Sequence, residues 1–131
     1  MDNTVEQMLA CRTVAVVGAT NRTHKYGYKI FANLRDKGYD VYPVHPALTE
    51  IDGVLCYKSL SDLPLVPEVV CLVVPPEVTE KVVEEGVRLG VKHVWMQPGA
   101  ESPKAIALCR ERGIPCVHEQ CIMILSRPKP A

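Results

Sequence analysis

Three amphipathic segments of this 131-residue chain end in a glycine, and a short apolar run follows each within a few residues. The glycines are Gly38, Gly90 and Gly113. Glycine closes a helix in the left-handed conformation without steric cost, so the recurrence indicates helices that are each followed by a strand. Short apolar strands that alternate with helices predict a parallel sheet covered on both faces. We therefore predict an α/β fold, a Rossmann-like open sheet of about five strands in a single domain, with a flavodoxin-like strand order as the alternative.

The individual elements follow from hydrophobic periodicity and from end signals. Helices are expected at 4–10, 27–37, 77–89 and 103–112, with a helical turn at 59–63. Strands are expected at 13–17, 40–44, 69–74, 93–96 and 116–117, with a short or irregular one at 54–57. Ser102 is a suitable N-cap for the helix that begins at Pro103. Residues 1–126 should form the domain, and residues 127–131, which include two prolines, a loose or docked tail.

Composition excludes several classes of partner. Lys plus Arg number 15 and Asp plus Glu number 15, and a protein without a basic excess is not expected to bind nucleic acid. No apolar run approaches the ~20 residues that span a bilayer, and the N-terminus lacks the features of a signal peptide. We therefore expect no membrane partner and a cytoplasmic location. The six cysteines form no C-x-x-C pair, so neither a disulfide framework nor a zinc site is expected.

The loop after the first apolar run carries the strongest functional signal. Gly18 lets the backbone approach a ligand closely, and the helix that begins near Gly27 directs free N–H groups and a positive dipole end toward an anion such as pyrophosphate. Arg22, His24 and Lys25 add cations to the same loop. In the alternative interpretation Gly18 only closes a tight turn and the cations are solvated. The expected contact residues are Gly18, Ala19, Thr20, Asn21, Arg22, Lys25, Tyr26, Gly27 and Tyr28.

The second strand argues against NAD as the ligand. NAD-binding sheets carry G-x-G-x-x-G and, at the end of the second strand, an acid that binds the ribose. Here the next glycine after Gly18 is Gly27, and Asp40 lies at the start of the strand, at the wrong edge of the sheet. Pro43 and Val44 stand where the carboxylate is expected. The pattern favours another adenine nucleotide, and coenzyme A (CoA) is the first candidate.

The other strand exits are candidates too, because ligands of an open parallel sheet bind beyond the C-terminal strand ends. Two exits are rigid and apolar, since proline fixes its own φ, and could form a slot for a flat base. The third contains a glutamine that could hydrogen-bond an amide or a phosphate. Ordinary loop rigidity and a plain strand-to-helix turn are the alternatives. The residues are Pro43, Val44 and His45, then Val74, Pro75 and Val78, then Gln97, Pro98 and Gly99.

A base, an acid and a thiol come together only in the segment 118–121. His118 and Cys121 could be interpreted as a catalytic pair. Sequence neighbours rarely face each other correctly for this chemistry, and no oxyanion site is indicated. We therefore expect no catalytic residue and no metal site.

As a set, these segments resemble the CoA-binding domain family, small proteins similar to the N-terminal CoA-binding domain of the succinyl-CoA synthetase α subunit. The resemblance covers roughly residues 8–121. It is carried by 16–20, by Tyr28 and the helix after it, by 38–46, 57–64 and 94–97, and by Cys121. Two segments depart from the family pattern. Family members often have a basic residue where this chain has 74–76, and Asp-Arg-Cys where it has 119–121.

The resemblance implies that CoA lies across the strand ends. Its phosphates would lie near 18–20 and Lys25, its adenosine at 43–44 and 74–75, and its pantetheine arm along 97–99. The first hypothesis is a non-catalytic protein that binds CoA or an acyl-CoA. The rivals are an NAD(P)-dependent or acyl-CoA-using enzyme, with Cys121 or His118 active, and a subunit of a separately encoded acyl-CoA ligase. The larger synthetases use a phosphorylated histidine and an ATP-grasp partner in further domains, and this chain ends before such a domain could begin. A homodimer through exposed apolar helix faces is a further option.

Overall fold

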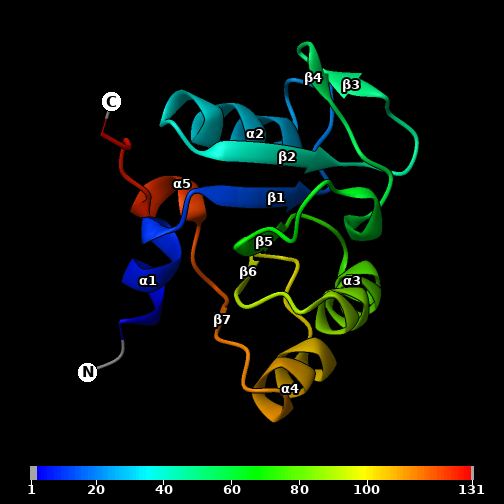
Figure 1. The fold of residues 1–131 in the computed structure, drawn as a ribbon, viewed down its shortest axis with the longest axis vertical. Coiled ribbons are helices and arrows are strands. Elements are labelled where there is room, and N and C mark those ends of the chain that lie inside the picture. Colours follow the sequence, from blue (N-terminus) through cyan, green and yellow to red (C-terminus); the bar gives the residue numbers. More distant parts are fainter. Residues whose placement is uncertain (1–2, 131) are drawn as a thin grey trace.

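A parallel sheet forms the centre of the computed structural model, which describes residues 3–130 (Figure 1). The strands are β1 (Thr13–Val17), β2 (Asp40–Val44), β5 (Val69–Leu72), β6 (Val94–Met96) and β7 (Cys116–Val117), in the spatial order β2-β1-β5-β6-β7. The helices are α1 (Thr4–Ala10), α2 (Tyr26–Asp36), α3 (Pro76–Leu89), α4 (Pro103–Glu111) and α5 (Ile122–Leu125), with a 3-10 turn η1 (Leu60–Asp62). A small antiparallel hairpin, β3 (Glu50–Ile51) and β4 (Val54–Leu55), lies beside the sheet.

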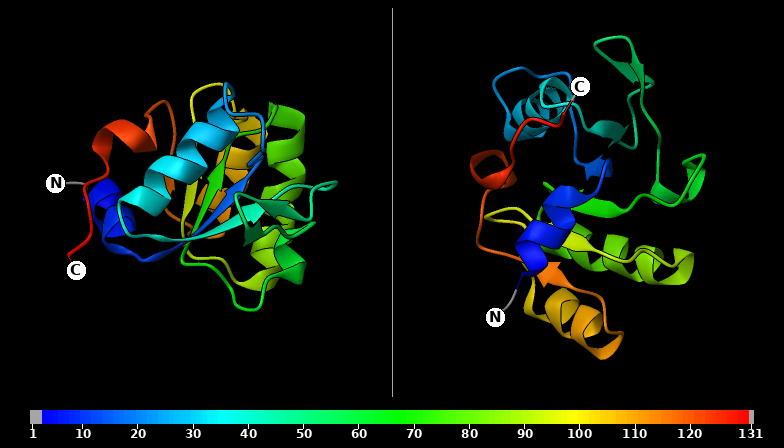
Figure 2. Two further views of the ribbon diagram at one scale, coloured as in Figure 1. Left: turned by 90° about the horizontal axis from the view of Figure 1, so that it is seen from above. Right: turned by 60° about the vertical axis from the view of Figure 1, so that its left-hand side comes forward.

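Helices cover both faces of the sheet, as predicted (Figure 2). Side chains alternate along each strand, so β1 sends Val14 and Val16 to one face and Ala15 and Val17 to the other. The first pair packs in a core cluster with α1, α2 and α5, and the second pair packs in a cluster with α3 and α4. Helix α2 contributes Ile30, Phe31 and Leu34 to the first cluster, where Phe31 is fully buried. The α/β class and the single open sheet are therefore confirmed.

One backbone bridge decides between the two strand orders. The five strands alone follow the flavodoxin-like order 2-1-3-4-5. Tyr57, however, pairs in parallel with Val44 on the outer edge of β2, where its N–H donates to Pro43 at 2.9 Å and its carbonyl accepts from His45 at 2.8 Å. If Tyr57 is counted as a strand of one residue outside β2, the strand order becomes 3-2-1-4-5-6, which is the order of the Rossmann fold. Of the irregular strand expected at 54–57, Val54 and Leu55 form β4 of the hairpin, and Tyr57 makes the bridge to β2.

Two short elements were not expected. The hairpin of β3 and β4 turns at Asp52 and Gly53, which both have positive φ, 51° and 78°. An Asp-Gly pair in this conformation is the signature of a type I′ turn, so the sequence did carry the signal. Helix α5 is only four residues long, and its apolar residues fit a strand as well as a helix. The strand expected at 69–74 ends at Leu72, because the chain turns away before Pro75.

The predicted helix ends are confirmed. Gly38, Gly90 and Gly113 all have positive φ, and Ser102 caps α4 by accepting the Ala105 N–H at 3.3 Å. The described part of the segment expected as a tail, residues 127–130, is docked against the domain. Lys129 donates its N–H to Lys37 and its ammonium to the carbonyl of Leu9, both at 2.6 Å. The first two residues of the expected domain and the last residue of the tail lie outside the described residues.

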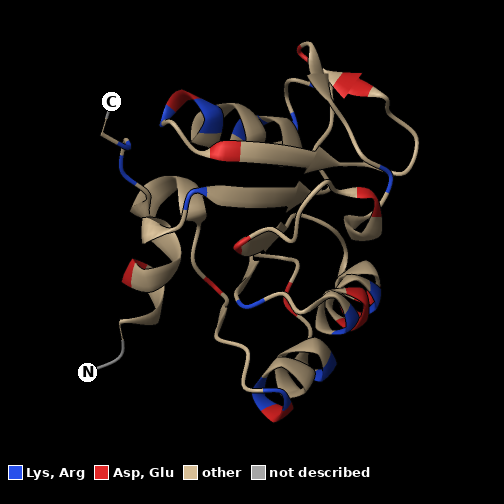
Figure 3. Ribbon diagram, in the orientation of Figure 1, with Lys and Arg blue, Asp and Glu red and all other residues tan. Residues whose placement is uncertain are grey.

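Charged residues of both signs are spread over the helices and loops (Figure 3). Within residues 3–130 no helix has both the length and the hydropathy that crossing a bilayer requires.

Candidate functional site

The backbone at the end of β1 packs closely against the segment that follows β5. Gly18 has φ +98°, and a Cβ placed there would overlap the carbonyl oxygen of Val73 and lie 2.8 Å from Cγ1 of Val74. The Gly18 N–H donates to the carbonyl of Val44 at 3.0 Å, which ties the loop to β2. Only glycine fits both the conformation and the space. The loop is therefore fixed by two neighbouring segments, the end of β2 and the residues that follow β5.

Helix α2 begins directly on this loop. A Cβ on Gly27 would overlap the carbonyl oxygen of Gly18, so the first turn of the helix reaches the strand without an intervening side chain. Lys25 occupies the N-cap position, and no described side chain caps this end. The first-turn N–H groups and the positive end of the helix dipole therefore face the strand-end region.

A cavity of about 760 Å³ opens in front of this helix end, and we call it the cationic cavity. Its lining contains Arg22, His24 and Lys25. Among the described residues, no Asp or Glu lines this cavity. Neither Arg22 nor Lys25 forms an ion pair within residues 3–130. The full lining is Gly18, Thr20, Arg22, His24, Lys25, Tyr26, Gly27, His45, Pro46, Val73, Val74 and Val78. Unpaired cations at an open helix N-terminus are suited to bind phosphate groups.

A second cavity of about 640 Å³, the apolar cavity, lies beside the first. The linings of the two cavities share Tyr26, Val73 and Val74, which places them side by side at the C-terminal edge of the sheet, and we call the pair the two-part groove. The apolar cavity is lined by Tyr26, Ile30, Val73, Val74, Pro75, Gln97, Pro98, Gly99, Ala100, Cys121, Met123 and Ile124. Its size lies within the range of small-molecule sites.

Gln97 holds one wall of the apolar cavity in place. Its side-chain Oε1 accepts the N–H of Ile122 at 2.7 Å, and its Nε2 donates to Sγ of Cys121 at 3.4 Å. The residue is 4% exposed. The amide is thus bonded to the start of α5, and Gln97 positions this wall of the cavity. A direct contact between Gln97 and a ligand stays a prediction.

Thirteen of the eighteen predicted site residues line the groove. Those that line neither cavity are Ala19, Asn21, Tyr28, Pro43 and Val44. Pro43 and Val44 are buried in β2 and contribute backbone, so the slot expected from them would be formed by their neighbours His45 and Pro46. Whether any of these residues contacts a ligand stays a prediction.

Tyr28 lies away from the groove, against the hairpin. Its hydroxyl donates to Oδ2 of Asp52 at 2.5 Å, and its ring packs at a tilt on Phe31. The hydrogen bond to Asp52 raises the pKa of the Tyr28 hydroxyl. Tyr28 therefore orients the hairpin relative to α2.

His45 sits where β2 leaves the sheet. Its Nδ1 accepts the N–H groups of Ala47 at 3.0 Å and Leu48 at 3.3 Å, which places the ring proton on Nε2. The ring is held by its own loop while it lines the cationic cavity.

Several residues that line the groove were not predicted as site residues. They are His24, Ile30, Pro46, Val73, Ala100, Cys121, Met123 and Ile124. His24 and Pro46 lie inside loops already singled out, so their neighbours gave the signal. Met123 and Ile124 had no signal, because their place in the wall depends on α5 and on its bond to Gln97.

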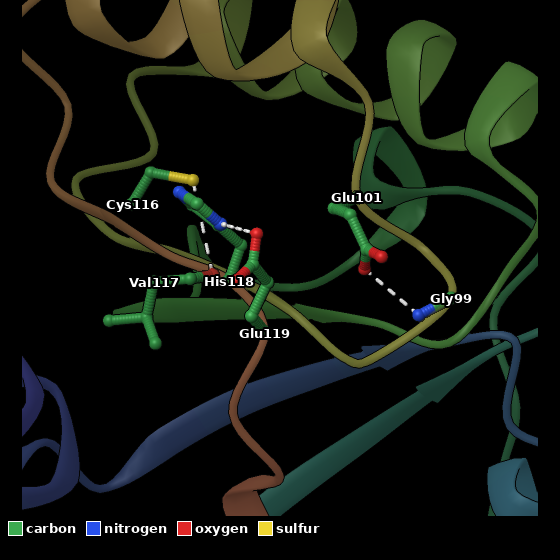
Figure 4. A network of polar contacts seen from close by, with 6 residues as sticks. All are labelled: Gly99, Glu101, Cys116, Val117, His118 and Glu119. Atoms are coloured by element: carbon green, nitrogen blue, oxygen red, sulfur yellow. Dashed lines mark hydrogen bonds and ion pairs between the residues drawn. The ribbon is translucent and has the colours of Figure 1, made fainter.

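The segment 118–121 does not assemble as a catalytic pair. His118 Nδ1 lies 3.5 Å from Oε1 of Glu119 (Figure 4), and His118 lines a separate hollow of about 140 Å³ between α4 and β7. Cys116 lines that same hollow, whereas Cys121 lines the apolar cavity. The base and the thiol of the proposed pair thus face different cavities.

Comparison with known proteins matches residues 12–127 to the model of a CoA binding domain. The chain is 41% identical over 81 residues to an ADP-forming acetate–CoA ligase of Methanocaldococcus jannaschii, covering 62% of this chain and 12% of the ligase. It is 29% identical over 126 residues to the α subunit of the ADP-forming acetate–CoA ligase II of Pyrococcus furiosus, covering 88% and 28%. A solved structure of a conserved hypothetical protein from Pyrococcus furiosus has a TM-score of 0.83 and 41% identity, covering 86% of this chain and 97% of that one.

The chain therefore spans only a minor part of these two ligase relatives but nearly the whole of the solved structure. The matched segment contains every residue that lines the two-part groove. This chain belongs to the CoA-binding domain family.

Proposed function

We propose that this chain binds CoA, or an acyl-CoA, along the two-part groove, and that it has no catalytic group of its own. The observation that carries the proposal is that the cationic and apolar cavities lie side by side, with Tyr26, Val73 and Val74 in the lining of both. CoA has the matching division, with phosphates at one end and an arm of low charge at the other. The phosphates would bind at the N-terminus of α2 beside Arg22 and Lys25.

The lining of the cationic cavity also argues against NAD as the ligand. Of the described residues that line the cationic cavity, none is a carboxylate that could bind a ribose in the manner of NAD-binding sheets. Asp40 pairs with Thr13 at the opposite end of β2 and so lies far along the strand from the cavity. His45, Pro46 and Val78 offer flat and apolar surfaces for the base.

Titration calorimetry with CoA, acetyl-CoA and NAD tests this assignment. We expect CoA and acetyl-CoA to bind more tightly than NAD, because only they use both cavities. Tighter binding of NAD would overturn the proposal. Turnover of an acyl-CoA panel, lost in a Cys121→Ala variant, would instead favour an acyl-CoA-using enzyme.

A second candidate function comes from the relatives. One of them is the α subunit of a ligase, and this chain corresponds to 28% of its length. The chain would then supply the CoA site of an ADP-forming ligase that a separately encoded chain completes. Formation of ATP from acetyl-CoA, ADP and phosphate by a reconstituted complex, but not by the chain alone, would support this candidate. Light scattering gives the molar mass of the purified chain in solution and so tests whether it forms a homodimer.

A further inference from the structure

The wall of the apolar cavity contains a nucleophile, the thiol of Cys121. Cys121 is half-buried at the start of α5. Its sulfur receives the Nε2–H of Gln97 at 3.4 Å, so the side chain that fixes the wall also fixes the sulfur. An N–H donor at this distance stabilises negative charge on sulfur, which is the charge that an attacking thiol carries.

The groove independently indicates a ligand with phosphates at one end and a chain of low charge at the other. The cationic cavity, in which Arg22 and Lys25 form no ion pair with any other described residue, is suited to phosphates. The apolar cavity is suited to the part of the ligand that extends from those phosphates. The family match adds that the ligand class is CoA, whose arm ends in a thiol. If CoA binds as proposed above, on which this inference rests, its sulfur and that of Cys121 share one cavity of about 640 Å³.

The other cysteines lie elsewhere. Cys56, Cys71 and Cys109 are buried, and burial raises the pKa of the Cys71 thiol, which lies near Cys121. Cys116 lines the hollow next to α4. Cys11 precedes β1 at the opposite edge of the sheet, where its thiol donates to the carbonyl of Gln7 at 3.4 Å. Cys121 is thus the one cysteine of the six that lines the two-part groove.

We propose that Cys121 captures CoA as a mixed disulfide by exchange with CoA disulfide. The Cys121 thiolate attacks one sulfur of the CoA disulfide, whose S–S bond breaks as the Sγ–S bond to CoA forms. The second CoA leaves as a thiolate and takes up the proton that Cys121 released. One disulfide is consumed and one is formed, so no further oxidant is required. A reducing thiol reverses the step and returns free CoA and the Cys121 thiol.

Mass spectrometry of the intact, non-reduced protein tests this exchange. The reduced protein is incubated with CoA disulfide or, in parallel, with oxidised glutathione at the same concentration. We expect one CoA adduct per chain, removed by dithiothreitol, and formed at least about 10-fold faster than the glutathione adduct because the groove binds the CoA part first. Peptide mapping of the wild-type adduct should place it on Cys121.

Two variants provide the matched comparison. Cys11→Ser, which changes a half-buried thiol outside the groove, should form the adduct at the wild-type rate, whereas Cys121→Ser should form none. If Cys121→Ser does not fold, the peptide map alone decides. An adduct on another cysteine, an internal disulfide without CoA, or equal rates with both reagents would each overturn the inference.

Calorimetry of the wild-type protein with reduced CoA separates this inference from the proposed function. If reduced CoA binds and CoA disulfide gives no adduct, the exchange is refuted and CoA binding stands. If reduced CoA does not bind, the proposed function fails first.

Discussion

Gly27 rests directly on the carbonyl oxygen of Gly18, so that the first turn of α2 and the end of β1 meet backbone to backbone. This contact positions the N–H groups of the helix at the cationic cavity. A side chain at Gly27 would separate the two segments, which would both strain the fold and move the proposed phosphate site.

Gly27→Ala should therefore lower the free energy of unfolding by about 1–3 kcal/mol, as expected for overpacking, and weaken CoA binding. Gly86→Ala is the matched control, because Gly86 also lies in a helix but a Cβ there would find its nearest neighbour, Val91, at 3.5 Å. That variant should gain about 0.5–1 kcal/mol from helix propensity. Urea denaturation measures both. Equal effects of the two substitutions would contradict the close approach.

Lys25→Ala should weaken CoA binding by about 1–3 kcal/mol, because a charge-assisted hydrogen bond to phosphate is lost. The salt dependence of binding should decrease with it. Lys104→Ala, on the exposed surface of α4, serves as the control and should bind as the wild type does. Calorimetry at two ionic strengths measures both effects. If the two lysine variants behave alike, Lys25 does not hold a phosphate.

Gln97→Ala should lower the free energy of unfolding by about 1–3 kcal/mol, because the buried N–H of Ile122 loses its acceptor. Amide hydrogen exchange should quicken in α5 and change little in α4. Gln120→Ala, an exposed neighbour of α5, should leave both measurements unchanged. Unaltered protection of α5 in the Gln97 variant would show that another contact holds this helix.

The sequence predicts those features that depend on local patterns. The strands around Val14 and Val69, the helix that buries Phe31 and the cap at Ser102 all follow from periodicity and end signals. The loop at Gly18 was predicted because glycine has a specific conformational role there.

Features that depend on long-range packing could not be predicted. The apolar cavity needs α5, a four-residue helix that depends on a hydrogen bond from Ile122 to Gln97, a residue 25 positions away. An irregular strand was expected at 54–57, but its reduction to a single pairing residue, Tyr57, beside β2 has no local pattern. Tyr28 was expected at the ligand, but its hydroxyl is bonded to Asp52, in a hairpin that was not predicted.

We expect the protonation of Glu68 to lower the free energy of unfolding at acid pH. Its Oε1 accepts the N–H groups of Thr13 and Arg12, each at 3.0 Å, and these bonds hold the pKa of the carboxyl below its ordinary 4.5. A depressed folded-state pKa stabilises the protein above the unfolded-state value, and this contribution is lost as pH falls below about 4.5 through the folded-state pKa.

Glu68→Gln should therefore lower the free energy of unfolding at neutral pH by only about 1 kcal/mol, because the carboxylate is exposed and screened. It should also make the free energy of unfolding depend less on pH in the acid range. Glu111→Gln on α4 is the control. Free energies of unfolding between pH 3 and pH 7 measure the difference. Parallel curves for Glu68→Gln and wild type would exclude this role of Glu68.

A crystal structure of the complex with CoA tests the central claim most directly. We predict the diphosphate against the first turn of α2 beside Lys25, and the sulfur of CoA in the apolar cavity between Gln97 and α5. CoA bound outside the two-part groove, or with its phosphates away from Gly18, would contradict the account.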